Sequence, residues 1–475
     1  MDQSKPSFFI TTPIYYVNAD PHLGTAYSTI IADVQARYRR SAGYNVKFLT
    51  GMDEHGEKVA EAAAAHGFDT PQAWCDSQAP LFQDLWRELE ISNDDFIRTT
   101  EPRQHHAVQY LWERMKESGY LYKGSYDGWY CVPEEPYFTE NQVKKSDEEH
   151  ETQGQHLCPD CGRPLERVQE ESYFFKLSAF QDKLLKLYDE HPDFVEPAFR
   201  MNEVRSFVEG GLNDLSVSRT SFDWGIQVPF DEGHVTYVWF DALLNYMTAV
   251  GYGVDTDEAR AELAYRWPAQ FHIVGKDIIR FHCVIWPAML MAIGEALPEH
   301  VFAHGFLTVR NAETGKAEKM SKSRGNVVNP NDIVDQYGAD TMRLAILFIA
   351  PPEKDFDWDP KAVAGANRFI KRAWNVVWQL AENGHAGEFD HKALKGHAGE
   401  LFRTLNGLGD RSTSDFDRGQ FNTAISAAME IVNAASKYVV ETPAADRVAE
   451  LDYLVARDIV AMLAPIIPPW AEELY

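Results

Sequence analysis

A short basic segment late in the chain has the residue types that hold an anion. Residues 319–326, KMSKSRGN, contain three cations, two hydroxyls and a glycine. A lysine ammonium is a compact charge on a flexible stem, and Ser, Gly and Asn leave backbone N–H groups accessible, so this composition suits a phosphate group. A solvated basic turn has the same composition, so the segment needs a partner elsewhere in the chain before it indicates a site.

Two polar strand ends near the N-terminus could be that partner. The sequence predicts a buried strand over residues 8–12 that then turns, an amphipathic helix over 26–38 and a second apolar strand over 46–49. Strand, helix and strand in succession indicate a parallel sheet, in which ligands bind where strands end and helices begin. His22 follows the first strand and Asp53 the second, so we expect the two side chains to converge.

The same order of strand, polar tip and helix recurs in the second half of the chain. Residues 271–274 predict a strand, Gly275 and Asp277 follow it, and a long apolar helix comes next. Before this unit, residues 237–246 predict a helix whose aromatic face is either packed core or the wall of a site. Beyond the basic segment the pattern is mostly helical, and a bundle is expected from about residue 361.

A cysteine-bearing module separates the two halves. Cys158 and Cys161 are two residues apart and a glycine follows them, which is the turn by which two thiolates face one tetrahedral Zn²⁺. Cys131 stands alone, so the fourth ligand would be Glu134, His156 or water. The alternative is that the three thiols are inert and the module folds without metal.

Size, charge and cysteine content limit the class of protein. A chain of 475 residues is long enough for two to four domains. Its net charge of −27 argues against nonspecific coating of nucleic acid but leaves room for local RNA contact. The five cysteines are few and odd in number, which indicates a reducing compartment, and no apolar run is long enough to span a membrane.

Two motifs together identify a family that the chain resembles. Residues 22–25, HLGT, follow the first strand, and residues 319–323, KMSKS, follow the second half-sheet. Both motifs in this order and context resemble a class I aminoacyl-tRNA synthetase. The resemblance implies an α/β fold, with a Rossmann-like parallel-sheet catalytic domain that is split by a small insertion and followed by an α-helical bundle of the anticodon-binding type. We expect catalytic halves at 1–118 and 204–325, an inserted connective module with a possible zinc knuckle at 119–203, a stem-contact linker at 326–360 and a helical tRNA-binding domain, possibly truncated, at 361–475.

Within that class, residues 13–25, 51–56, 218–225, 237–246 and 272–282 look like those of methionyl-tRNA synthetases. The resemblance assigns methionine binding to Ile14, Tyr16, Asp53, Trp239, Ala242, Leu243, Tyr246, Ile278 and His282, with Asp53 at the ammonium group. It assigns ATP binding to Tyr16, His22, Gly24, Thr25, Gly275, Asp277 and Lys322. The catalytic residues would be His22, Thr25, Lys319 and Lys322, and the tentative metal ligands are Cys131, Glu134, Cys158 and Cys161.

The resemblance implies a methionine–tRNA ligase that uses ATP and Mg²⁺, with Zn²⁺ possible, and that binds tRNA. We expect a monomer in the cytoplasm without membrane association.

A leucine-type ligase is a second interpretation, because residues 347–355, 365–374 and 421–425 look more like leucyl-tRNA synthetases. The insertion is too short for the large editing domain that leucyl enzymes generally carry. A third interpretation is a catalytically idle tRNA-binding paralogue, and a fourth is a plain nucleotidyltransferase.

Overall fold

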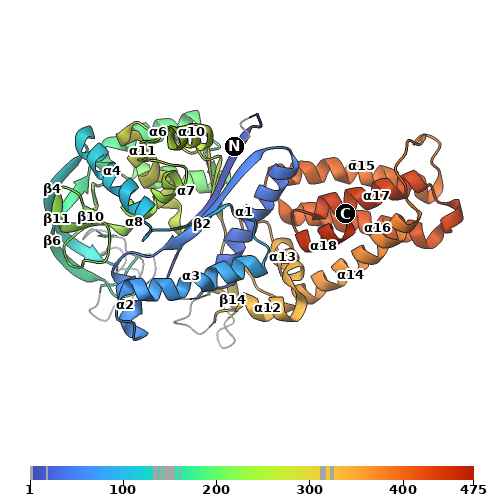
Figure 1. Ribbon diagram of the computed structural model, residues 1–475, viewed down its shortest axis with the longest axis horizontal. Helices are drawn as coiled ribbons and strands as arrows, with labels where there is room; N and C mark the ends of the chain where they lie inside the picture. The colour runs from blue at the N-terminus through green and yellow to red at the C-terminus, as the bar shows by residue number, and fades with distance from the viewer. Residues whose placement is uncertain are drawn as a thin grey trace.

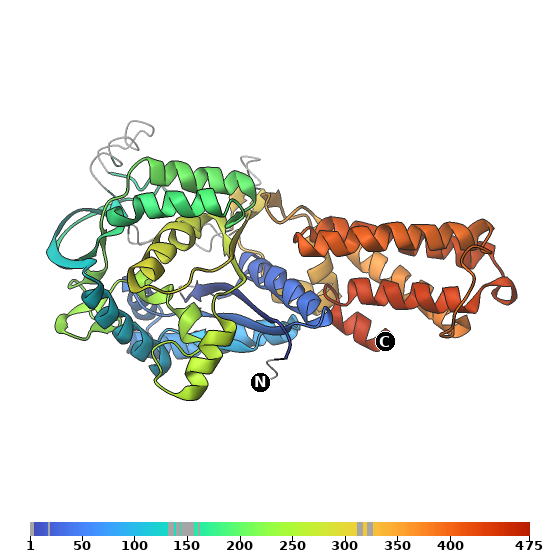
Figure 2. The same cartoon turned by 90° about the horizontal axis from the view of Figure 1, so that it is seen from above.

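The computed structural model describes residues 4–17, 20–131, 137–138, 143, 156–159, 162–310, 317–320 and 326–475, apart from the side chains of Tyr126, Tyr137 and Lys319. The molecule is elongated, with a mixed α/β body at one end and a helical bundle at the other (Figures 1 and 2). The fold class predicted from the sequence is therefore confirmed. None of the helices in the described parts of the chain is long and apolar enough to cross a membrane.

A six-stranded parallel sheet forms the centre of the body. Its strand order is β3-β2-β1-β12-β13-β7, and every described pairing is parallel. The strands are β1 (Ser7–Tyr16), β2 (Asn45–Asp53), β3 (Asp95–Arg98), β7 (Val195–Glu196), β12 (Phe271–Gly275) and β13 (His300–His304). From β1 the chain continues to β2 and β3 on one side of the sheet, and from β12 it continues to β13 on the other side. The strand order therefore reverses between β1 and β12. Ligands of such sheets bind at the carboxyl ends of the strands beside this reversal.

Strand β1 is longer than the sequence suggested. We expected a turn after residue 12, but the strand continues to Tyr16. Its pairing with β2 shifts register between Thr11 and Ile14. Pro13 lies in this irregularity, where its missing N–H is tolerated, so the proline interrupts the ladder without ending the strand. The strand therefore delivers Ile14, Tyr15 and Tyr16 to the edge where ligands bind.

Helices cover both faces of the sheet. One apolar core joins α1 (Leu23–Ser41) and α3 (Pro71–Glu88) to the helical bundle, and the other joins α4 (Pro102–Ser118) and α11 (Trp286–Ile293). Further α-helices in the described part of this body are α2 (Glu57–Ala65), α6 (Gln181–Glu190), α7 (Ala198–Glu209), α8 (Val238–Ala242), α9 (Asn245–Thr248) and α10 (Asp257–Arg266).

The inserted segment contains an antiparallel sheet of order β5-β4-β6-β8. Its strands are β4 (Leu121–Tyr130), β5 (Tyr137–Phe138), β6 (Glu166–Phe175) and β8 (Leu215–Ser216), and β9 (Ser218–Arg219), β10 (Gln227–Val228) and β11 (Asp231–Thr236) form a small sheet nearby. Helices α6 and α7 pack into the catalytic core, and β7 extends the main sheet beside β13. The domain limits expected from the sequence, including the end of the module at 203, stay a proposal.

The C-terminal part is helical. Helices α12 (Pro330–Tyr337) and α13 (Ala339–Phe348) lead from the body to the bundle of α14 (Pro360–Asn383), α15 (Gly396–Asp417), α16 (Phe421–Glu441), α17 (Ala449–Leu463) and α18 (Pro468–Leu474). A three-stranded sheet of β14 (Leu307–Arg310), β15 (Ala317–Lys319) and β16 (Phe356–Asp357) lies beside this junction. Figure 2 shows the long bundle helices running side by side away from the body.

Candidate functional site

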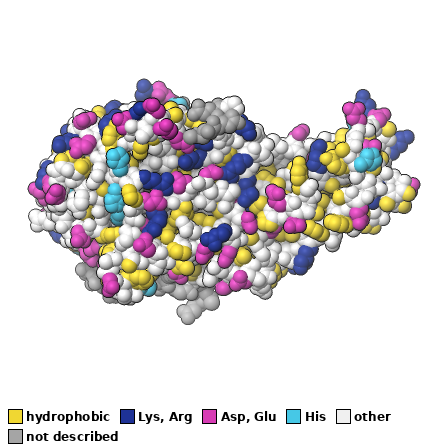
Figure 3. All heavy atoms as spheres, in the orientation of Figure 1, with side chains coloured by type: hydrophobic (Ala, Val, Ile, Leu, Met, Phe, Trp, Pro, Cys, Tyr) yellow, Lys and Arg dark blue, Asp and Glu magenta, His cyan; other side chains and the backbone are white. Residues whose placement is uncertain are grey.

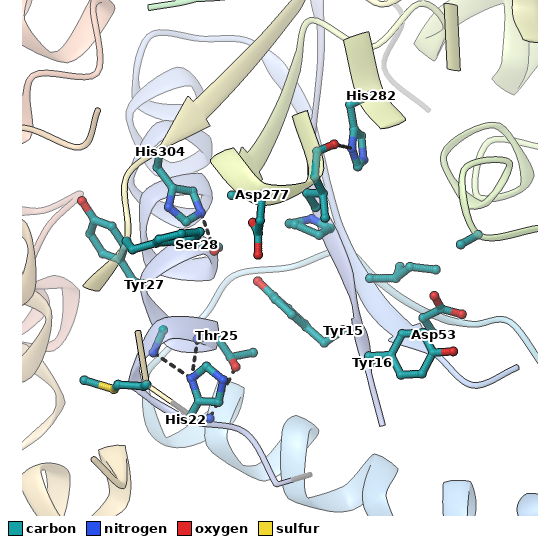
Figure 4. A pocket seen from close by; sticks show the side chains of 18 of the residues that line it. Tyr15, Tyr16, His22, Thr25, Tyr27, Ser28, Asp53, Asp277, His282 and His304 are labelled. Atoms are coloured by element: carbon teal, nitrogen blue, oxygen red, sulfur yellow. Dashed lines mark hydrogen bonds between the residues drawn. The ribbon is translucent and has the colours of Figure 1, made fainter. Parts of the chain in front are cut away.

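A cavity of about 320 Å³ lies at the carboxyl ends of β1 and β12, where the strand order reverses (Figure 4). It is lined by every residue predicted to bind the amino acid or ATP other than Lys322. These are Ile14, Tyr16, His22, Gly24, Thr25, Asp53, Trp239, Ala242, Leu243, Tyr246, Gly275, Asp277, Ile278 and His282. The polar tips of both half-sheets therefore meet around one cavity.

Helix α1 begins at this cavity with His22 as its N-cap. His22 Nδ1 accepts hydrogen bonds from the backbone N–H groups of Gly24 (3.0 Å) and Thr25 (3.3 Å), as Figure 4 shows. Because Nδ1 accepts, the neutral ring carries its proton on Nε2, which makes that atom a donor. A β-carbon on residue 24 would lie 2.9 Å from the His22 ring, so a larger residue would push this ring out of its capping position. The positive end of the helix dipole and the outward Nε2–H of His22 favour an anion.

Sequence reasoning missed a polar pair beside this helix. Ser28 Oγ lies 2.7 Å from His304 Nε2, and His304 Nδ1 lies 2.8 Å from the carbonyl oxygen of Gly305. Nδ1–H therefore donates to the carbonyl, and Ser28 donates to Nε2. Tyr27 packs edge-on against His304 at 5.3 Å. Two sequence positions could have indicated this pair. Ser28 lies one helical turn after Thr25, and His304 lies at the end of β13.

The opposite end of the cavity is aromatic. Tyr246 Oη donates to His282 Nε2 (2.7 Å), and His282 Nδ1–H donates to the carbonyl oxygen of Ile278 (3.0 Å). The ring of Trp239 stacks on Phe281, with centroids 3.7 Å apart. Aromatic rings around a hydroxyl and a neutral imidazole can enclose an apolar, polarisable side chain.

His282 lies in a π-helical turn, Phe281–Ile285, where the sequence predicted a continuous helix. Pro287 has no N–H to bond back to Cys283, and the carbonyl oxygen of Cys283 instead accepts from Tyr188 Oη (2.7 Å). The local widening is therefore satisfied by a tertiary hydrogen bond. Such turns recur at functional sites because they redirect one side chain.

Asp53 adds a carboxylate to the lining of this cavity. It closes β2, is 4% exposed and lines the cavity. Its carbonyl oxygen accepts from the N–H of Val17 (3.3 Å), and Tyr16 Oη donates to the carbonyl oxygen of His55 (2.9 Å). These bonds fix the strand tip against β1. A buried carboxylate beside an aromatic pocket suits a substrate that carries an ammonium group.

Comparison with known proteins gives the family. The family "tRNA synthetases class I (M)" matches residues 8–374, and "Anticodon-binding domain of tRNA ligase" matches residues 399–475. The methionine–tRNA ligase of Caldanaerobacter subterraneus subsp. tengcongensis is 44% identical over 446 residues, which are 92% of this chain and 66% of that protein. The methionine–tRNA ligase of Thermotoga maritima is 53% identical over 340 residues, 72% of this chain and 51% of that protein.

The chain belongs to the methionyl family of class I tRNA synthetases. It spans between about half and two thirds of the length of these two relatives. The Mycobacterium tuberculosis methionyl-tRNA synthetase, solved in complex with methionyl-adenylate, superposes with a TM-score of 0.87 at 39% identity, covering 99% of this chain and 93% of that one.

The match to the methionyl family continues beyond the basic loop to residue 374. It therefore includes residues 347–355 and 365–374, which resemble leucyl-tRNA synthetases in sequence. Those segments contribute α13 and α14 at the junction between the body and the bundle. The leucyl resemblance of this part stays a prediction.

Some predicted site residues lie outside the described residues. These are Lys322 of the basic loop and the proposed metal ligands Glu134 and Cys161. For Lys319 the backbone alone is described, in β15, paired with Thr308 of β14. The neighbouring Met320 lines the cavity, so the start of the basic loop reaches the site.

The His282 environment predicts a pH dependence of stability. Burial lowers the pKa of His282 to about 4, below the usual value of about 6.5. The unfolded chain therefore takes up the proton first, so this contribution to stability is intact above pH ~6.5 and falls as the pH drops toward ~4, by roughly 3 kcal/mol in total. Urea unfolding of the wild type and of His282→Gln between pH 7.5 and 5 should show the steeper loss in the wild type. Parallel curves would contradict this. Burial also lowers the pKa of His272, which is present in both proteins and contributes a loss of the same sign in each.

Proposed function

We propose that this chain activates methionine with ATP and transfers the methionyl group to tRNA. The observation that carries the proposal is that the amino end of α1, an aromatic pocket and the carboxylate of Asp53 all border one cavity. The activity for which the two relatives are named, methionine–tRNA ligase, and the methionyl-adenylate of the M. tuberculosis complex support it.

In the first step a carboxylate oxygen of methionine attacks the α-phosphorus of ATP. The bond to the bridging oxygen of pyrophosphate breaks, which gives methionyl-adenylate and pyrophosphate. In the second step a terminal ribose hydroxyl of tRNA attacks the carbonyl carbon and AMP leaves. Neither step requires a covalent bond to the enzyme, so catalysis depends on positioning and on stabilising charge on the phosphates.

The residues of the cavity suit these steps. The His22 Nε2–H at the positive end of α1 would hold phosphate oxygens, and Asp277, with Gly275, would lie on the adenosine side. Asp53 would hold the ammonium, and Tyr246 with His282 would contact the thioether. Lys322 would neutralise the departing pyrophosphate. Mg²⁺ would accompany the phosphates and supply further positive charge there.

Amino-acid-dependent exchange of pyrophosphate into ATP tests this function. We expect exchange with methionine and little with leucine. Exchange with leucine but not methionine would replace the proposal by the leucine-type ligase, and no exchange with either would leave the idle paralogue. Exchange is measured with each amino acid at saturating ATP, and the other amino acid serves as the control.

Helix α14 offers a surface for the tRNA. Trp378 is 52% exposed, and its ring lies nearly parallel to that of Trp374, at 12° and 6.4 Å. Lys371 is exposed seven residues before Trp378, on the same stripe of the helix, and Arg368 and Arg372 are exposed beside it. On the face seen in Figure 3, acidic and basic side chains are interspersed over the body. Helix α14 differs locally, because three exposed cations lie beside the exposed Trp378 and the half-buried Trp374. Such a combination suits unpaired RNA bases.

Replacing Trp378 with alanine should raise the KM for tRNA in aminoacylation by about 5- to 100-fold, as expected for loss of stacking of one base. Methionine-dependent pyrophosphate exchange should not change, because α14 does not line the cavity. Phe199→Ala, at an exposed aromatic of α7 that is 50% exposed, is the matched control. An unchanged KM for tRNA in the Trp378 variant would remove α14 from the RNA surface.

We also propose that the inserted module holds a structural Zn²⁺. Cys131 and Cys158 are buried in one small cluster. The turn after Cys158 is tight, since the N–H of Gly162 donates to the carbonyl oxygen of Cys158 (2.9 Å) and Gly162 has φ +71°. This donor set fits zinc, which would hold the turn closed; among the described residues no group of three candidate ligands is complete. Metal analysis of the purified protein should give about one zinc per chain, and substoichiometric zinc would favour inert thiols.

The expectations of a monomer and of a cytoplasmic location remain our predictions. Light scattering coupled to size-exclusion chromatography tests the first of them, since a dimer would double the mass of 54.0 kDa.

A further inference from the structure

A buried hydrogen-bonded pair lies directly behind the amino-acid end of the cavity. His55 Nδ1–H donates to Asp241 Oδ2 at 2.6 Å, and the two residues are 2% and 1% exposed. Neither residue lines the cavity. The pair joins the tip of β2 to helix α8, across 186 positions of sequence. It therefore connects the two halves of the split catalytic domain.

Each member of the pair is held in place by neighbours. The Gln104 amide donates to both the carbonyl oxygen and Oδ1 of Asp241, each at 2.8 Å. The His55 ring lies between Trp224 and His105, with both centroids 5.4 Å away. Trp224 Nε1 donates to the carbonyl oxygen of Glu54 (2.6 Å), next to His55. The imidazole thus has one orientation, with Nδ1 directed at α8.

The residues on either side of the pair are the walls of the site. Asp53 precedes His55 by two positions, and the His55 carbonyl oxygen accepts from Tyr16 Oη (2.9 Å). On the other side, Asp241 lies between Trp239 and Ala242 of α8, which line the aromatic end. The 2.6 Å bond between His55 and Asp241 therefore fixes how far the carboxylate of Asp53 stands from the aromatic wall. Gln104 and the apolar core around Phe240 also hold α8, and the bond to His55 is a direct contact between this short helix and the tip of β2.

We propose that His55 and Asp241 are positioning residues that set the length of the amino acid the site accepts. The inference rests on the proposed function, because it takes Asp53 as the ammonium partner and the aromatic end as the side-chain pocket. On this proposal the intact bond holds Asp53 and the aromatic wall at the separation that an unbranched side chain of methionine's length requires. Without this bond, α8 is free to shift from β2. The selectivity of the site for methionine over shorter or longer thioether amino acids is then smaller.

The test compares His55→Leu, His55→Asn and Asp241→Asn with the wild type in pyrophosphate exchange. The substrates are methionine, the shorter S-methylcysteine and the longer ethionine. In His55→Leu we expect the KM for methionine to rise about tenfold and its selectivity over the other two amino acids to fall by a similar factor, with the KM for ATP unchanged. In His55→Asn the amide N–H replaces Nδ1–H, so selectivity should largely return.

Asp241→Asn keeps the shape of α8, so it still tests the hydrogen bond if the leucine variant fails to fold. It should lower selectivity in the same direction, because an amide accepts a weaker hydrogen bond than a carboxylate. A uniform loss of activity with all three amino acids at unchanged selectivity, or wild-type kinetics in His55→Leu, would overturn the proposal. A wild type that does not activate methionine would instead overturn the proposed function itself, so the two failures are distinct.

Discussion

Replacing Arg343 with methionine should lower the free energy of unfolding by about 3–5 kcal/mol, the usual cost of removing one partner of a buried ion pair. Arg343 and Asp33 are both 0% exposed, and Arg343 Nη2 lies 2.6 Å from Asp33 Oδ2. Methionine fills much of the space of the side chain but leaves the carboxylate buried with less compensation. Urea unfolding at pH 7 measures the loss.

The guanidinium has more than one partner, which is why the expected effect is large. It also donates to the carbonyl oxygens of Leu89 (3.0 Å), Pro465 (3.1 Å) and Ile466 (2.8 Å). These acceptors belong to the end of α3 and to the segment between α17 and α18. Arg343 therefore joins the catalytic helices to the bundle, and its loss should also expose this junction to proteases.

Arg37→Met is the matched control. Arg37 Nε lies 2.9 Å from the same oxygen of Asp33, but its side chain is 24% exposed, so water can replace it. Its substitution should cost clearly less than that of Arg343. Equal losses in the two variants would show that burial of Arg343 does not decide the energy of the pair.

The candidate site could be predicted largely because its residues follow apolar strands. A buried strand is recognisable by its composition, and the polar residues after it are placed at the ligand-binding edge by the rules of parallel sheets. His22, Asp53 and Asp277 were found in this way. The resemblance to a family then supplied the aromatic residues, since an aromatic stripe by itself is equally consistent with core.

The remaining features depend on partners that are distant in sequence. The bonds of Ser28 to His304 and of His55 to Asp241 join residues 276 and 186 positions apart, and no local pattern indicates them. Strand β7 has two residues, too few for a periodic signal. The π-helical turn at His282 was not predicted because the hydroxyl that satisfies the carbonyl oxygen of Cys283 belongs to Tyr188, which is distant in sequence. Tertiary contacts decided each of these features.

Asp53→Asn should lower kcat/KM for methionine in pyrophosphate exchange by about 10²- to 10⁴-fold, which corresponds to the ~3–5 kcal/mol lost when a buried charge loses its partner. Asparagine keeps the shape of the side chain and the backbone bond to Val17, so β2 should stay in register with β1. The substrate ammonium would then enter a cavity where residue 53, at 4% exposure, no longer offers a countercharge. Lost binding of the amino acid should appear mainly as a higher KM for methionine.

Asp277→Asn distinguishes this role from a general electrostatic effect. Asp277 lines the same cavity on the side of Gly275 and β12, away from β2 (Figure 4). If Asp53 binds the ammonium and Asp277 faces the adenosine, the first variant should raise the KM for methionine and the second the KM for ATP. Each variant removes one carboxylate from the same cavity, so an effect of the overall charge alone would change each KM by a similar factor in both variants. A crossed pattern would therefore assign each carboxylate to its substrate, and the same changes of both KM values in the two variants would refute the assignment of Asp53.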